Sequence, residues 1–158
     1  MSAIRKSPAL VQALALGLAG GMRSQMPLAL LANTPNPCGD AGSLLHTPLV
    51  QRLTLLAAGA ELVADKLPGI GSRLAPGPLI ARLLIGGVAG GVVASRASQP
   101  RLAGVALGAT GAALGAWTGY HLRATLVAET PLPDVVFAVA EDLTALTLGV
   151  LATRQASS

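Results

Sequence analysis

Five apolar segments, separated by loops rich in proline and glycine, are the feature that most constrains this chain of 158 residues. They cover residues 8–31, 49–64, 79–93, 102–120 and 135–151. Since a membrane-spanning helix needs about 20 mostly apolar residues, the pattern predicts an all-α, polytopic integral membrane bundle of four or five spans. The second and third segments are short, which leaves the number of spans open. We expect residues 1–158 to form a single membrane domain.

The low content of charged residues favours a membrane protein over a soluble one. Charged residues make up 11% of the chain, against about 25% in a typical soluble domain. The alternative is a soluble helical protein rich in alanine and leucine, which would need more polar surface. The net charge of +4 is spread over the chain, and aromatic residues make up only 2%, which argues against nucleic acid as a partner. Basic loops instead suit an anionic lipid surface.

The sequence contains no recognised catalytic, phosphate-binding or dinucleotide-binding motif. Cys38 is the only cysteine, so it forms no disulfide within the chain. We therefore expect no enzyme activity, no cofactor and no metal site. The first 21 residues are also similar to a signal peptide, but the apolar run continues beyond them, which favours a retained first segment.

Glycines recur at four-residue spacing in the third and fourth apolar segments. In lipid, such ridges let helix backbones approach closely, either within one chain or between copies. We expect packing roles, and a homo-oligomer, from Gly86, Gly87, Gly90, Gly91, Gly104, Gly108, Gly111, Gly115 and Gly119.

Charged residues inside apolar segments are the candidates for function. Each costs roughly 2.5–3.5 kcal/mol at the centre of a spanning helix, so each needs a partner or water. We predict that Arg23 and Arg123 pair with the acids, while Lys66 extends to the interface. This network is either structural or a pathway for an ion, proton or solute. Its acids are Glu61, Asp65, Glu141 and Asp142.

The stretch GGMRSQMP, residues 20–27, predicts a broken first helix. Pro27 has no backbone N–H, so the carbonyl of Arg23 loses its partner four residues later. Gly20 and Gly21 weaken the helix further. We therefore expect a break that directs Arg23 towards the acids.

A weak internal similarity aligns Arg23 with Arg123 and Glu61 with Glu141. The halves would be residues 9–66 and 101–152, joined by a span at 79–95. One intervening span would make them an inverted repeat, as in transporters, with a second polar break at Arg123. The identities are few, so chance is the alternative.

The sequence encodes membrane orientation poorly. With five spans, five basic residues fall on the side of the N-terminus and four on the other, which is a weak bias. The first set is Arg5, Lys6, Lys66, Arg73 and Arg123, and the second is Arg52, Arg96, Arg101 and Arg154.

Three motifs carry a resemblance to a known family, and together they extend over about residues 10 to 152. They are G-x-R-x-x-x-P at Gly21, Arg23 and Pro27, E-x-x-x-D-K-x-P at Glu61, Asp65, Lys66 and Pro68, and the late acidic pair Glu141 and Asp142. The chain resembles the small bacterial membrane proteins grouped as domain of unknown function 4126. That resemblance implies a membrane location, but no activity.

We accordingly expect a bacterial inner-membrane protein that acts as a small transporter or channel for a small ion or anionic solute. The alternative is a non-transporting membrane protein whose buried ion pairs only specify helix packing.

Overall fold

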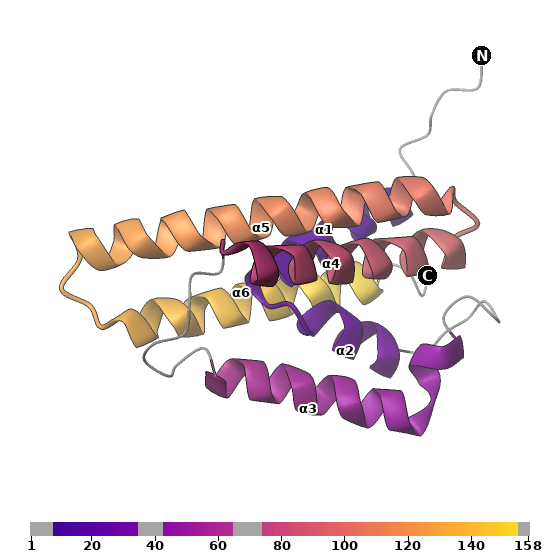
Figure 1. Cartoon of the computed structure of the whole chain (residues 1–158), viewed down its shortest axis with the longest axis horizontal. Helices are drawn as coiled ribbons and strands as arrows, with labels where there is room; N and C mark the ends of the chain where they lie inside the picture. Colours follow the sequence, from indigo (N-terminus) through magenta and orange to yellow (C-terminus); the bar gives the residue numbers. More distant parts are fainter. Residues whose placement is uncertain (1–7, 35–42, 65–73, 155–158) are drawn as a thin grey trace, which may run out of the picture.

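The computed structural model describes residues 8–34, 43–64 and 74–154, and these form helices without any strand. Figure 1 shows them as an elongated bundle with α5 as its longest helix. The elements are α1 (Pro8–Met22), α2 (Met26–Asn33), the short 3₁₀ helix η1 (Ser43–His46), α3 (Pro48–Ala64), α4 (Pro76–Arg96), α5 (Arg101–Glu129) and α6 (Asp134–Arg154). The predicted all-helical class is confirmed.

Three of these helices are long and apolar enough to cross a membrane. They are α4, α5 and the stretch Asp134–Thr153 of α6, while α1 is a shorter apolar helix. Both α4 and α5 extend beyond the apolar segments predicted for them, because flanking polar and proline residues join their first and last turns. This composition is that of an integral membrane protein.

Large apolar side chains cover the outside of the bundle, and small residues fill its inside. Leu53, Leu84, Trp117 and Leu143 are each more than half exposed, whereas the buried apolar residues are mainly alanines. A soluble domain would bury such large side chains, since burial is the main source of its stability. The distribution therefore suits a bundle surrounded by lipid.

Glycines set the closeness of the helix contacts. Gly86 and Gly90 of α4 pack against Gly104 and Gly108 of α5, backbone to backbone. Further along α5, Gly111 and Gly115 meet α1 in the same way. At these six glycines a Cβ atom would collide with the backbone of the neighbouring helix, whereas Gly87, Gly91 and Gly119 of the predicted set lie nearest to side chains.

Helices α1 and α2 form a re-entrant unit rather than one span. From the break, α2 runs back towards the end of the bundle where α1 begins (Figure 1). Ala9 near the start of α1 and Leu31 near the end of α2 belong to one buried cluster with Val93 and Ala152, near the ends of α4 and α6. The first apolar segment therefore enters and leaves at the same end of the bundle.

This arrangement corrects two expectations. The first segment does not pass from one end of the bundle to the other, because the chain reverses direction at its break. Nor does the predicted second break exist, since α5 continues through Arg123 to Glu129. The physical reason is that Pro27 follows Arg23 by four residues, whereas Val127 stands at that distance from Arg123.

Candidate functional site

The break between α1 and α2 lies where GGMRSQMP predicts it, and it positions the polar residues of the site. The N–H of Arg23 still donates to the carbonyl of Ala19 at 2.8 Å, so α1 closes normally. The carbonyl of Arg23 then accepts from Met26 at 3.2 Å, which tightens the chain into a turn instead of continuing the helix. The N–H groups of Ser24 and Gln25 are left outside the helical ladder.

Glu61 of α3 accepts those freed N–H groups. Its Oε1 takes the N–H of Ser24 at 2.9 Å and the Ser24 hydroxyl at 2.6 Å, and its Oε2 takes the N–H of Gln25 at 2.9 Å. Gln25 is the residue that precedes α2, so the carboxylate sits at the positive end of that helix. A residue 36 positions away thus replaces the local side-chain cap that Gln25 does not supply.

Arg23 pairs with Asp142 of α6. The guanidinium donates from Nε to Oδ1 of Asp142, and Nη2 lies against the same oxygen. Arg23 is only 2% exposed, and among the described residues it heads the fully buried side chains ordered by volume. The largest side chain at the centre of this bundle is therefore a charged one, held by a carboxylate from the last helix.

Arg82 of α4 adds a second buried arginine. Its Nη2 lies 3.9 Å from Oε1 of Glu61. We call Arg23, Ser24, Gln25, Glu61, Arg82 and Asp142 the helix-break cluster; its two arginines and two acids balance in formal charge. Four elements supply them: the α1–α2 break, α3, α4 and α6.

A second group of charges, the α5–α6 cluster, joins Arg123 to Asp134 and Glu141. Nε of Arg123 donates to Oδ1 of Asp134 at 2.7 Å, and Nη2 donates to Oδ2. This is the bidentate geometry that favours arginine with carboxylates. Nη1 of Arg123 is 3.9 Å from Oε2 of Glu141, a longer ion pair.

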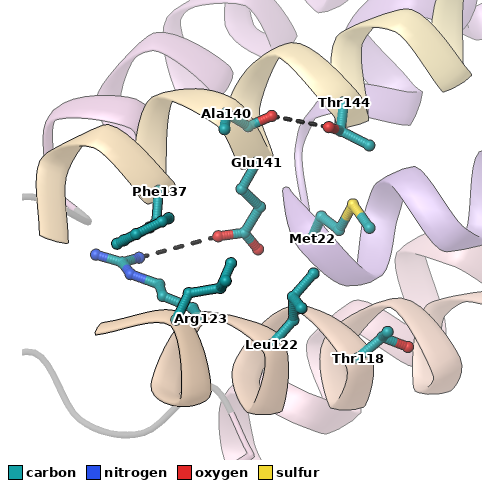
Figure 2. Close-up of a pocket in the computed structure, with 10 residues that line it drawn as sticks. Met22, Thr118, Leu122, Arg123, Phe137, Ala140, Glu141 and Thr144 are labelled. Carbon is teal, nitrogen blue, oxygen red and sulfur yellow. Dashed lines mark hydrogen bonds and ion pairs between the residues drawn. The ribbon is translucent and has the colours of Figure 1, made fainter. Parts of the chain in front are cut away.

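A cavity of about 130 Å³ lies beside this second cluster. Figure 2 shows Glu141 and Arg123 facing each other across it, with Phe137, Leu122 and Met22 among the walls. An apolar cavity of 150 Å³ is large enough to hold benzene, so this one has room for a small solute. Its walls come from α5, α6 and the end of α1.

The two clusters adjoin each other through the acidic pair of α6. Consecutive helix residues point about 100° apart, so Glu141 faces the cavity while Asp142 faces Arg23. Met22, which lines the cavity, precedes Arg23. The cavity therefore adjoins the helix-break cluster at two points, because Met22 precedes Arg23 and Glu141 precedes Asp142 in the chain.

The structure brings together part of the predicted network and rearranges it. Arg23 meets Asp142, and Arg123 lies near Glu141, but Glu61 binds backbone N–H groups instead of Arg23 or Arg123. Asp65 and Lys66 lie outside the described residues.

Sequence reasoning missed Arg82, Asp134 and the backbone of the break. Arg82 carried a usable signal, because it is the only charge in the apolar segment 79–93. Asp134 looked like an ordinary loop residue before α6. Nothing in the sequence shows that two backbone N–H groups would bind Glu61.

The end of α2 has partners of its own. Arg96 donates to the carbonyl of Leu31 at 3.3 Å, and the side-chain amide of Gln51 to that of Ala32 at 2.9 Å. These donors satisfy carbonyls that a helix end leaves open. The short helix is therefore fixed at both ends by other elements.

No family model, curated protein or solved structure matches the chain.

Proposed function

We propose that this protein is a small membrane transporter or channel for a small ion or an anionic solute, with the helix-break cluster as its polar centre. The observation that carries the proposal is that the carboxylate of Glu61 binds the N–H groups exposed at the break between α1 and α2. Broken helices whose N-terminal ends face a charged group are the usual way in which transporters build sites at membrane depth. Membership of the family that the sequence motifs resemble, a bacterial inner-membrane location and self-association belong to the same proposal.

Glu61 indicates what chemistry the centre accepts. Its carboxylate accepts hydrogen bonds from two N–H groups and a hydroxyl, and it lies near the guanidinium of Arg82. Together these donors form an anion-binding arrangement. An anionic solute would use the same donors after Glu61 turned away. In this mechanism the carboxylate of Glu61 competes with the solute for these donors.

The cavity supports a route to this centre. Its walls are mostly apolar, with Arg123, Glu141 and two threonines as the polar residues, and it adjoins the break through Met22. Asp134 begins α6, and Asp142 lies about 12 Å further along this helix at 1.5 Å per residue. Because Asp142 pairs with Arg23, the break is about that distance from the end of the bundle where α6 begins. A solute would enter through the cavity and pass to the Arg23–Asp142 pair.

Flux into liposomes tests the proposal. Purified protein is reconstituted and screened with chloride, small carboxylates, protons and monovalent cations. We expect flux of at least one of these above that of empty liposomes, and a large change in Glu61→Gln. Glu129→Gln is the matched control, because Glu129 is an exposed acid outside both clusters. Flux equal to that of empty liposomes for every ion would refute transport.

A structural role is the second candidate, and the pairing of the buried charges favours it. Arg23 is held by Asp142, and Glu61 is held by three donors. Buried pairs of this kind can serve only to fix which helices meet. Under this candidate, Arg23→Gln lowers the unfolding temperature in detergent, and neither it nor the wild type produces flux.

A further inference from the structure

The distribution of charge between the two ends of the bundle determines which way the protein sits in the membrane. One end contains the start of α1, the end of α2, the start of α3, the α4–α5 turn and the end of α6 (Figure 1). Four arginines lie within about one turn of these helix ends: Arg52, Arg96, Arg101 and Arg154. We call this the basic rim, and no acid of the described residues lies on it.

The opposite end is acidic by comparison. Glu129 ends α5 and Asp134 begins α6, and both are exposed. The described basic residue nearest to this end is Arg123, which is bonded twice to Asp134. Among the described residues, the basic rim thus carries four arginines and the opposite end carries Arg123, which is the same division of these five residues that the five-span interpretation of the sequence gives.

The helix dipole favours Arg96 at the end of α4 and Asp134 at the start of α6, but it does not account for the other charges at the two ends. A helix start favours acids and a helix end favours bases. Arg101 is the first residue of α5 and Glu129 is its last, so both occupy the electrostatically unfavourable end. Arg52 is in the first turns of α3, and neither Arg52 nor Arg101 forms an ion pair among the described residues. These exposed charges need an explanation outside the chain.

We propose that the basic rim lies against the cytoplasmic leaflet of the membrane, so that Pro8 and Arg154 are on the cytoplasmic side and the α5–α6 turn faces the other side. Arginine and lysine accumulate in cytoplasmic loops of membrane proteins, and anionic headgroups of that leaflet attract them. Arg52 and Arg101 are exposed, so their side chains can extend along their helices to reach this surface, whereas Arg96 is buried against Leu31. The cavity beside Glu141 then opens in the outer half of the membrane.

Cysteine labelling tests this orientation with the full chain. Cys38→Ser removes the only cysteine. Ala97→Cys in the α4–α5 turn and Leu132→Cys in the α5–α6 turn are then introduced separately, both at exposed positions. The probe is a membrane-impermeant maleimide, applied to bacterial cells with a permeable outer membrane, and to lysed cells as the measure of full reactivity.

We expect the Leu132→Cys variant to label in intact cells and the Ala97→Cys variant to label only after lysis. Labelling with the opposite preference, equal labelling of both variants in intact cells, or protection of both would each overturn the proposal. Arg52→Gln combined with Arg101→Gln tests the cause. A share of these chains should become labelled at position 97 in intact cells, and an unchanged pattern would show that these arginines do not set the orientation.

Discussion

Gly86→Ala tests whether the glycine contacts determine the stability of this bundle. A Cβ atom at Gly86 would lie 2.7 Å from the carbonyl oxygen of Gly108 and 2.7 Å from Cβ of Ala112, whereas ordinary contact begins at 3.4 Å. The α4 and α5 backbones must therefore separate locally by the difference, about 0.7 Å. Overpacking of this kind costs about 1–3 kcal/mol, and exchanging glycine for alanine in a helix returns about 0.5–1 kcal/mol.

The expected net loss is about 1–2 kcal/mol, which corresponds to a fall in unfolding temperature of roughly 2–8 °C for a chain of this size. The assay is loss of the helical circular dichroism signal on heating in detergent. Gly59→Ala is the matched control, because nothing lies within 4 Å of a Cβ atom at that position of α3. The control should equal or exceed the wild type. If Gly86→Ala unfolds no earlier than Gly59→Ala, the close approach of α4 and α5 is not what the structure describes.

Three further predictions concern the charged residues. Arg23→Gln and Asp142→Asn should each lower thermal stability, and the double variant should lose less than the sum, with a coupling of about 0.6–1.7 kcal/mol in a double-mutant cycle; simple additivity would contradict the pair. In Glu61→Gln, one carboxylate oxygen is replaced by an NH₂ group that cannot accept a hydrogen bond. Hydrogen exchange of the backbone N–H of Ser24 or Gln25 should then accelerate roughly tenfold, for a loss of about 1.4 kcal/mol, while exchange within α5 stays unchanged. Gly119→Ala places a Cβ atom 2.7 Å from Oε1 of Glu141, which is the end of a flexible side chain. Flux should therefore change, while the unfolding temperature stays within about 2 °C of the wild type. A large loss of stability would show that Glu141 cannot move.

The sequence predicts the class of this fold and the position of its first irregularity. Apolar run lengths indicate the long helices, and the pair of Arg23 with Pro27 four residues later indicates the break. These are local effects, because both the length of a helix and the loss of one backbone N–H depend on neighbours in the chain. The glycine spacing predicts helix contacts for the same reason.

The partners at the site could not be predicted in the same way. A carboxylate gains almost as much from two backbone N–H groups as from a guanidinium, so the sequence cannot show that Glu61 caps α2 rather than pairing with an arginine. Which of Glu141 and Asp142 faces Arg23 depends on the rotation of α6 about its axis. The direction of α2 after the break depends on tertiary contacts such as Arg96 with Leu31.

The pair of Arg23 and Asp142 has a consequence for synthesis of the protein. The two residues are 119 positions apart, so the first helical unit emerges from the ribosome long before its counter-charge exists. An arginine without a partner is costly within a bilayer, and α1 alone is short. Insertion of the α1–α2 unit is therefore more favourable after α6 has been made, because Asp142 then neutralises Arg23. In this order of events the last helix completes the insertion of the first.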